Sequence, residues 1–312
     1  MLLDRNDVLG MLQCPKTGSP LVVDGNRLIA NDSKQITEYE LIDGYPVVVD
    51  FDNSVLQKED IKTLSSKVER RTYGGGAGFI KRVLFPPKST TARNVKRILD
   101  LVLCQNHHAR VLIVGGGSVG QGMAPFYDNS GIDLVSFDIY ASPSVQLIAD
   151  AHNIPFSGES FDVVIIQAVL EHVLQPEKVV SELYRVLKKD GIVYAETPFL
   201  QHVHEGAYDF TRYTESGHRY LFREFELLQS GVSAGAGTQL LWSLDNFFRG
   251  LFRSRRVGKL FKILFFWLQY CDRLIPESYN IDSASGVFFM GKKNDSAISR
   301  KAIIGHYMGA QK

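Results

Sequence analysis

The sequence predicts an α/β protein built on a doubly wound, Rossmann-like sheet of seven strands. Four apolar runs between residues 108 and 199 alternate with stretches of helical periodicity: RVLIVG, DLVSFDI, FDVVIIQAV and GIVYAETPF. Continuous apolar strands that alternate with helices are typical of a parallel sheet covered on both faces. The chain has 312 residues, of which 45% are hydrophobic, so it is long enough for one large core with further units attached.

The first 55 residues are predicted to form a small β-rich domain. Three short runs rich in β-branched residues, LVVD, RLIA and YPVVVDF, are separated by the turn residues Asp24-Gly25 and Asp43-Gly44. Short strands joined by such turns favour a compact antiparallel unit ahead of the α/β core.

Residues 56–105 are predicted to be a helical linker. Their pattern is helical but polar, with a glycine-rich break at Tyr73-Gly74-Gly75-Gly76 and a stop at Pro86-Pro87. The α/β core is then expected over residues 106–237.

Residues 238–282 are predicted to be a helical insertion before the last strand of the sheet. The segment is rich in aromatic and basic residues, and it has no acidic residue between Asp245 and Asp272. A strand-like run, SGVFFMGKK, follows, so residues 283–312 are expected to hold the last strand and a tail.

Composition narrows the function classes. A formal net charge of +1 provides no general attraction for nucleic acid, and we expect no nucleic-acid partner. Three widely spaced cysteines, Cys14, Cys104 and Cys271, favour a reducing compartment, so a cytoplasmic location is expected. The N-terminus does not resemble a secretory signal, and no stretch has the roughly eighteen unbroken apolar residues of a membrane span.

The stretch VLIVGGGSVGQG, residues 111–122, satisfies the pattern G-x-G-x-x-G through Gly115, Gly117 and Gly120. A strand that enters such a turn brings backbone N–H groups and a helix N-terminus against a nucleotide-type ligand. The next predicted strand ends in Asp138, whose carboxylate is placed to accept hydrogen bonds from ribose hydroxyls. These residues leave a dinucleotide, S-adenosylmethionine (SAM) and an ordinary tight turn as alternatives.

Two further segments resemble the class I SAM-dependent methyltransferases with an LPF…FD…LEH signature: ADAHNIPFSGESFDVVIIQAVLEHV (149–173) and ELYRVLKKDGIVYAETPF (182–199). The resemblance covers about residues 110–235 and implies SAM as the cofactor. It implies that Asp150 and Ala151 meet the adenine ring and that Gln167 and Ala168 face the cofactor. It also places the methionine end and the ribose at Gly115, Gly116, Gly117, Asp138 and Ile139. Ile113 and Val119 depart from the usual acidic residue and third glycine of the family.

Acid–base side chains gather after the predicted fifth strand, at the edge where parallel sheets bind ligands. Seventeen residues there hold His202, His204, Glu205, Asp209, Arg212, Tyr213 and His218. An imidazole with a pKa of about 6.5 suits proton removal at neutral pH. We therefore predict His204 or His202 as a general base, oriented by Asp209 or Glu205.

Other roles for these side chains stay open. His202, His204 and Asp209 have a spacing that resembles a metal site, although the favoured prediction contains no metal. His172, in the LEHV segment, lines the site in many relatives and is a further catalytic candidate. Arg212 and Arg219 are candidates for binding an anionic acceptor or for exposed salt bridges.

The resemblance implies a SAM-dependent methyltransferase. The stretch PFLQHVHEGAYDFTRYTESGHRYLFREFE also resembles a branch often found among enzymes of cell-surface polysaccharides and glycolipids. We expect O-methylation of a small-molecule, glycan or glycolipid acceptor. The alternatives are a non-catalytic SAM-binding or scaffold protein and a dinucleotide-dependent oxidoreductase.

The N-terminal domain resembles a small zinc-ribbon family that includes activator subunits of methyltransferases. The shared features are LxCP near the start and a closing DGxPVVV. Cys14 stands alone, with Thr17 at the second ligand position, and one thiolate does not make a tetrahedral zinc site. We expect a degenerate, metal-free ribbon that caps the cofactor cleft, recruits a partner or is a residual scaffold.

The predicted insertion combines basic and large apolar side chains. Basic residues beside an aromatic-rich helix favour an anionic membrane surface, which would make the protein peripheral on the inner face of the membrane. A hairpin packed on the sheet or on a second subunit is the alternative, and RNA binding is a third. The oligomeric state stays open. The residues concerned are Arg249, Arg253, Arg255, Arg256, Lys259 and Lys262 together with Leu241, Trp242, Phe247, Phe248, Leu251, Phe252, Phe261, Ile263, Leu264, Phe265, Phe266, Trp267 and Leu268.

Overall fold

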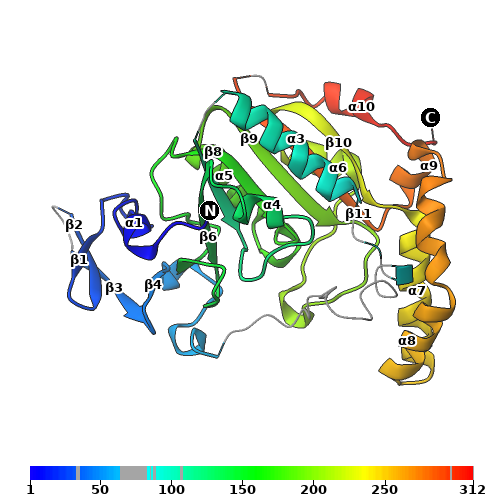
Figure 1. Ribbon diagram of the computed structural model, residues 1–312, viewed down its shortest axis with the longest axis horizontal. Helices are drawn as coiled ribbons and strands as arrows, with labels where there is room; N and C mark the ends of the chain where they lie inside the picture. The colour runs from blue at the N-terminus through cyan, green and yellow to red at the C-terminus, as the bar shows by residue number, and fades with distance from the viewer. Residues whose placement is uncertain are drawn as a thin grey trace.

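A computed structural model describes residues 1–32, 36–63, 83–84, 86, 89–105, 108–295 and 297–311. Much of the predicted linker, including its breaks at 73–76 and at Pro87, lies outside the described residues. One eleven-stranded sheet runs through the described chain (Figure 1). Its strands lie in the order β1 (Val22–Asp24), β2 (Arg27–Asn31), β3 (Ile36–Ile42), β4 (Tyr45–Val48), β7 (Leu147–Ala149), β6 (Ile132–Asp138), β5 (Ala109–Val114), β8 (Phe161–Gln167), β9 (Leu187–Pro198), β11 (Gly286–Lys293) and β10 (Phe225–Ala234).

The centre of the sheet is parallel. β4, β7, β6, β5, β8 and β9 run in one direction, and β11 is antiparallel to both β9 and β10. The carboxyl ends of the central strands therefore meet at one edge, where open α/β sheets bind ligands. This mixed, largely parallel sheet confirms the predicted α/β class.

The predicted count of seven strands is too low for the continuous sheet. The strands from β5 to β11 do number seven, but β4 pairs with β7 through Val47 opposite Ile148 and Val48 opposite Ala149. The predicted N-terminal β unit therefore extends the sheet. The physical reason is that β7 would otherwise present unpaired backbone groups along one edge.

Helices cover both faces of the sheet. α3 (Ser89–Gln105) and α4 (Ala124–Tyr127) share one hydrophobic core with Val111 and Ile113 of β5. α5 (Pro176–Val186) and α6 (Glu215–Leu221) share the other core with Leu112 and Val114. This alternation along β5 follows from the two-residue repeat of a strand, so a fully apolar strand contributes to two cores at once.

The N-terminal unit packs into the second of these cores. After α1 (Arg5–Leu9), the buried side chains of Leu12, Cys14 and Tyr39 belong to the same hydrophobic cluster as α5. Cys14 Sγ lies 3.1 Å from the Tyr39 hydroxyl. Two short 3₁₀ helices, η1 (Phe51–Asn53) and η2 (Lys58–Asp60), then flank a segment, residues 54–56, that reaches the edge of the central sheet.

Helices fill the chain between β10 and β11. They are α7 (Ala236–Leu251), α8 (Arg255–Leu264), η5 (Phe266–Arg273) and α9 (Glu277–Asp282), and α7 and α8 project away from the sheet (Figure 1). Asp272 holds the start of α7 by accepting hydrogen bonds from the backbone of Gly235, Gly237 and Thr238. Among the described residues, no helix combines the length and the apolar character that crossing a membrane requires. The short helix α10 (Ala302–His306) follows β11.

Candidate active site

A cavity of about 390 Å³ opens at the carboxyl ends of the central strands. Its wall is formed by the segments that follow β5, β6, β7, β8 and β9, together with residues from the N-terminal unit and from α7. Ten of the site residues predicted from sequence line it: Gly115, Asp138, Ile139, Asp150, Ala151, Gln167, Ala168, His172, His204 and Glu205.

At the three consecutive glycines, neighbouring side chains leave no room for a Cβ atom. Gly115 lines the cavity with a φ of +76°, and a Cβ there would lie 2.2 Å from Val169 Cγ2. A Cβ on Gly116 would lie 1.8 Å from Ser136 Oγ, and one on Gly117 would lie 2.3 Å from the Tyr140 ring. Gly116 and Gly117 are not among the residues that line the cavity, and a role for them in binding the cofactor stays a prediction.

Asp138 ends β6 with its carboxylate fixed by two backbone amides. The Gly117 N–H donates to Oδ2 at 2.7 Å, and the Ile139 N–H donates to Oδ1 at 2.7 Å. Hydrogen bonds from N–H groups stabilise the ionised form of a carboxylate. A carboxylate at this edge of the sheet is placed to accept hydrogen bonds from ribose hydroxyls.

Asp150 lies next to the cavity but its carboxylate is already engaged. Burial raises its pKa, but hydrogen bonds from His152 and Ser54 outweigh that effect and hold the pKa below its usual value. His152 Nδ1 lies 2.6 Å from Oδ1, and the Ser54 hydroxyl donates to Oδ2. Sequence reasoning missed Ser54 as a partner of Asp150, and it also missed Val55 and Leu56 as cavity-lining residues. No local pattern links these three residues to the segment around Asp150, which lies almost one hundred residues later in the chain.

Gln167 is the last residue of β8, and Ala168 follows it. The Gln167 amide donates to Glu196 Oε2 at 3.0 Å, and the Ala168 N–H donates to the Glu196 carbonyl oxygen at 2.9 Å. Ala168 has a φ of +56°, which is uncommon for a residue with a side chain and is typical of functional sites held by their surroundings.

These residues fit a nucleoside cofactor of the size of SAM. The cavity volume lies in the range of small-molecule sites, about 300–1,000 Å³. Asp138 supplies the carboxylate for ribose, and the small side chain of Ala151 together with the apolar Val55 and Leu56 provides a wall for a planar base. His172 and His204 also line the cavity.

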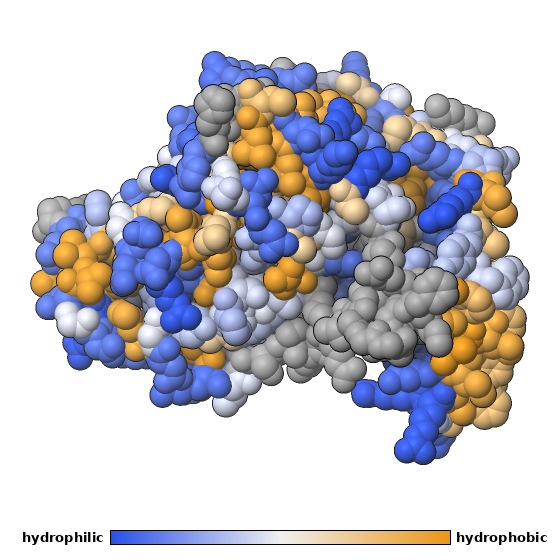
Figure 2. Space-filling view, in the orientation of Figure 1, coloured by the Kyte–Doolittle hydropathy of each residue, from blue (hydrophilic) through white to orange (hydrophobic). Residues whose placement is uncertain are grey.

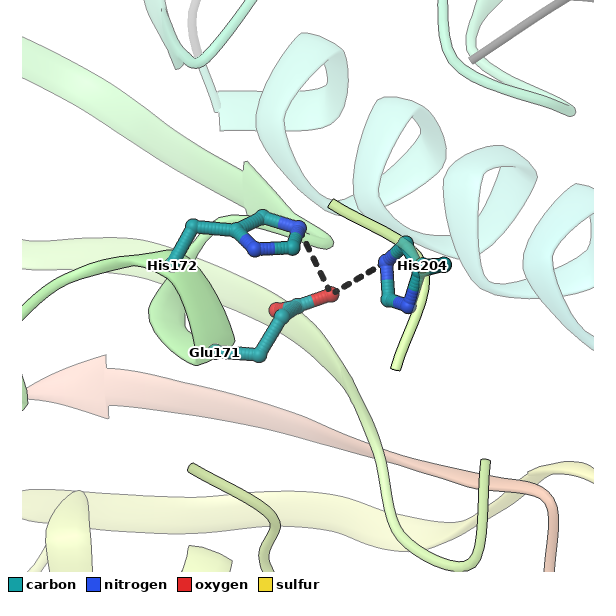
Figure 3. Close-up of side chains that lie close together, drawn as sticks. All are labelled: Glu171, His172 and His204. Carbon is teal, nitrogen blue, oxygen red and sulfur yellow. Dashed lines mark ion pairs between the residues drawn. The ribbon is translucent and has the colours of Figure 1, made fainter. Parts of the chain in front are cut away.

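Together with the buried Glu171, these two residues form what we call the histidine cluster: Glu171, His172 and His204 (Figure 3). Glu171 and His172 lie in η3 (Leu170–His172) after β8, and His204 lies in the loop after β9. Both rings turn toward one oxygen of Glu171 (Figure 3): Oε1 is 3.7 Å from His172 Nε2 and 3.8 Å from His204 Nε2. Sequence reasoning missed Glu171, although it directly precedes His172 in the LEH segment.

Acceptors fix the far side of each imidazole ring. His172 Nδ1 lies 2.7 Å from the Tyr208 carbonyl oxygen, so this nitrogen carries the proton. Burial lowers the pKa of His172 and so favours its neutral form. His204 Nδ1 lies 3.4 Å from Asp209 Oδ2, which also accepts the His204 backbone N–H at 2.9 Å.

Asp209 is itself held by Arg212. Burial raises the pKa of Asp209, but hydrogen bonds from Arg212 and from the His204 amide outweigh this and lower the pKa to about 2. Asp209 is therefore ionised at neutral pH and able to orient His204. Asp209 contacts His204 and does not itself line the cavity.

Several predicted residues lie elsewhere. His202 is exposed and does not line the cavity, so the structure favours His204 over it. Arg212 is engaged by Asp209 and by the Gln201 carbonyl, and Arg219 is buried against the carbonyls of Phe222 and Phe225, so neither is placed to bind an anionic acceptor. The structure brings together Glu171, His172 and His204 in place of the metal set considered from sequence.

Comparison with known proteins identifies the central part of the chain. Residues 114–195 match the family model described as a methyltransferase domain. Over 98 residues, the chain is 37% identical to a demethylmenaquinone methyltransferase of Renibacterium salmoninarum, a match that covers 28% of this chain and 40% of that protein. A protein of the same name from Paenarthrobacter aurescens is 35% identical over 98 residues, covering 28% of this chain and 38% of the relative. The chain thus spans about two fifths of the length of these relatives.

Among solved structures, the chain is similar to phosphoethanolamine N-methyltransferase 2 of Haemonchus contortus in complex with S-adenosyl-L-methionine. The TM-score is 0.44 with 15% sequence identity, and the match covers 88% of this chain and 70% of that chain. From the sequence matches, the chain carries a SAM-dependent methyltransferase domain, and S-adenosyl-L-methionine is its cofactor. The predicted enzyme class and cofactor are confirmed, whereas the zinc-ribbon resemblance of the N-terminal unit stays a prediction.

Proposed function

We propose that this chain, through its SAM-dependent methyltransferase domain, methylates a hydroxyl oxygen of a small-molecule, glycan or glycolipid acceptor. One observation carries the proposal: a single cavity is lined both by Asp138 and Gly115, which suit the cofactor, and by His172 and His204, which suit an acceptor. Acid–base groups and cofactor groups in one cavity are what methyl transfer to a hydroxyl needs.

Different residues of the chain bind the cofactor and take the proton. When bound, SAM supplies a methyl carbon attached to a sulfonium, a good leaving group for displacement by an oxygen nucleophile. Asp138 accepts hydrogen bonds from the ribose, and the walls of the cavity hold the two reactants side by side. His204 is the proposed group that takes the acceptor's proton, and the ionised Asp209 behind it stabilises the resulting imidazolium.

The rest of the cavity wall suits a polyhydroxylated acceptor. Gln201 and Glu205 offer hydrogen-bonding groups, and Tyr208 and Trp242 offer aromatic surface. Aromatic walls with a few polar groups are typical of sites that bind and orient an organic ligand. The curated relatives are named for demethylmenaquinone, but the match spans too little of them to carry an acceptor over to this chain.

We also propose that α7, α8 and η5 rest on an anionic membrane surface, which makes the protein peripheral on the inner face of the membrane. Figure 2 shows an apolar patch over this part of the molecule, beside a polar tip. Large apolar side chains are exposed there: Leu240, Phe247, Leu251, Phe252, Leu260, Ile263, Leu264 and Trp267. Trp242, on the same helix α7, lines the cavity, so this placement brings a lipid-linked acceptor near the histidine cluster.

Measurements of SAM binding and of methyl transfer test the cofactor side and the acceptor side of the proposed site separately. We expect Asp138→Ala to weaken SAM binding at least tenfold by calorimetry, because the ribose loses its carboxylate. His204→Ala should bind SAM within about twofold of the unchanged protein, yet release no S-adenosylhomocysteine when sugars, glycolipids and other hydroxyl acceptors are supplied.

Three results would contradict the proposal. Equal loss of SAM binding in both variants would indicate a folding role for His204. SAM binding without turnover on any acceptor would favour a non-catalytic SAM-binding protein. Binding of NAD(P)H in place of SAM would favour an oxidoreductase. This binding is measured as a rise in the protein's melting temperature, which a ligand of the native state produces.

A further inference from the structure

We propose that the histidine cluster holds a divalent transition-metal ion, with Glu171 Oε1, His172 Nε2 and His204 Nε2 as its protein ligands. The inference rests on the proposed function for the role of the ion, which is to receive the acceptor's oxygen. The ion-binding site itself follows from the geometry of the three side chains (Figure 3).

The first argument is the spacing of the three atoms. Both nitrogens lie 3.7–3.8 Å from the same carboxylate oxygen, and all three atoms lie within 4.8 Å of one another. These separations are too long for N–H···O hydrogen bonds, whose heavy atoms lie about 2.7–3.2 Å apart. Ligand atoms about 2.1 Å from a tetrahedral ion lie about 3.4 Å apart, so small side-chain rotations complete the site.

The second argument is the orientation of the rings. His172 Nδ1 donates to the Tyr208 carbonyl, so Nε2 is the ring nitrogen that faces Glu171. His204 Nδ1 lies 3.4 Å from the carboxylate of Asp209, which Arg212 holds in place, and its Nε2 faces Glu171. Each ring therefore presents one nitrogen to the same carboxylate oxygen.

The third argument is the surrounding structure. Metal-binding histidines usually donate their other ring N–H to a carbonyl or carboxylate, which fixes the ring. His172 donates to a backbone carbonyl in this way, and His204 Nδ1 lies 3.4 Å from both the Asp209 carboxylate and the His202 carbonyl oxygen. Both rings line the cavity, whereas the Glu171 side chain is only 1% exposed, so coordination positions remain open toward the cavity.

The ligand set indicates which ion binds and what it does. Two imidazoles and one carboxylate suit Zn²⁺, Mn²⁺ or Fe²⁺ better than Ca²⁺ or Mg²⁺. A hydroxyl that contacts such an ion ionises more easily: its O–H bond breaks, the electron pair stays on oxygen and the proton passes to water. His204 Nε2 then acts as a ligand, so the ion takes over the activation assigned above to a free imidazole.

Metal binding to the full chain tests the inference directly. After treatment with a chelator, the protein is titrated with Zn²⁺ and Mn²⁺ by calorimetry, and with Co²⁺ by visible absorption. We expect one equivalent of metal and a Co²⁺ absorption band. Glu171→Gln and His204→Ala should each weaken binding at least 100-fold and remove the band. The matched control is His202→Ala, an exposed histidine two residues from the cluster, which should bind metal like the unchanged protein.

SAM binding measured on the same samples separates this inference from the proposed function. Retained SAM binding by Glu171→Gln shows that the variant is folded. Absence of stoichiometric metal, or equal metal binding by the cluster variants and the His202→Ala control, would overturn the metal site while leaving the methyltransferase proposal intact. Failure of the unchanged protein to bind SAM, with metal still bound, would overturn the proposed function instead.

Discussion

The residues of the histidine-rich loop and the following helix α6 have sharply different environments. His204 lines the cavity and His202 is exposed, although they are separated by only one residue. On a regular strand, residues two apart point to the same side, but this loop has no regular secondary structure. His218 lies in α6 and is completely buried beside Phe222 and Phe289, so it belongs to the core and not to the site.

His218 should make the fold sensitive to acid. Burial lowers its pKa to about 3, and its ring nitrogens have no hydrogen-bond partner among the described residues. Its pKa in the unfolded chain is about 6.5, so between pH 6.5 and 3 the unfolded chain binds a proton that the folded chain does not. The free energy of unfolding should therefore fall as the pH falls through this range, by up to about 1.4 kcal/mol per pH unit.

Urea unfolding at several pH values measures this effect. The His218→Leu variant should show a shallower dependence of stability on pH, because it lacks the group that gains a proton on unfolding. His108→Asn, which removes an exposed histidine, is the matched control. Equal slopes for the unchanged protein and His218→Leu would exclude His218 as the source of acid sensitivity.

At the scale of elements, helix α5 fixes the segment that follows β7. Arg185 donates to the carbonyl oxygens of Phe156 at 2.6 Å and Ile154 at 2.7 Å, and Glu182 accepts the Ile154 N–H at 2.8 Å. The same segment begins with Asp150 and Ala151, which line the cavity. The amphipathic pattern of α5 predicted a helix here, but not that its Glu182 and Arg185 satisfy the backbone of a neighbouring loop.

Loss of this connection should destabilise the protein. We expect Arg185→Ala to lower the free energy of unfolding by about 1–2 kcal/mol, because two backbone carbonyls lose a charged donor at a partly exposed position. Urea denaturation gives the value. Lys178→Ala, an exposed change on the same helix, should stay within about 0.5 kcal/mol of the unchanged protein. A similar loss in both variants would mean that the loop contact of Arg185 is not responsible, because alanine itself favours the helix.

At the scale of the whole molecule, the N-terminal unit and the helices after β10 lie at opposite ends of the sheet, and each contributes to the cavity wall (Figure 1). The N-terminal unit extends the sheet through β4 and adds Val55 and Leu56. The helices add Trp242. The cavity is therefore completed by parts of the chain that lie outside the segment matching the methyltransferase domain.

The proposed membrane surface predicts sedimentation with vesicles. We expect the full chain to sediment with anionic phospholipid vesicles but not with zwitterionic ones. The triple variant Arg253→Glu, Arg255→Glu, Arg256→Glu should lose this binding, because each exposed basic group contributes about 1 kcal/mol near anionic headgroups. Sedimentation that is unchanged in this variant would refute the proposal.

A variant with the same change in charge provides the control. Arg93→Glu, Lys96→Glu and Lys178→Glu alter exposed residues of α3 and α5, and this protein should still sediment with anionic vesicles. If neither protein nor control binds vesicles and the chain forms a dimer, the apolar patch is a subunit interface.

Local sequence patterns determined the α/β class, the strand that leads into Gly115, the carboxylate of Asp138 and the segment that contains His172. The first three depend on periodicity or on a turn within one short stretch, and such signals are readable without the rest of the chain. The His172 segment was found through its resemblance to class I SAM-dependent methyltransferases. Only the tertiary structure decided that Glu171 meets His204, that β4 pairs with β7, and that Ser54 bonds Asp150. These contacts join segments far apart in sequence, and the way loops fold back on the sheet leaves no periodic pattern in the residues that meet.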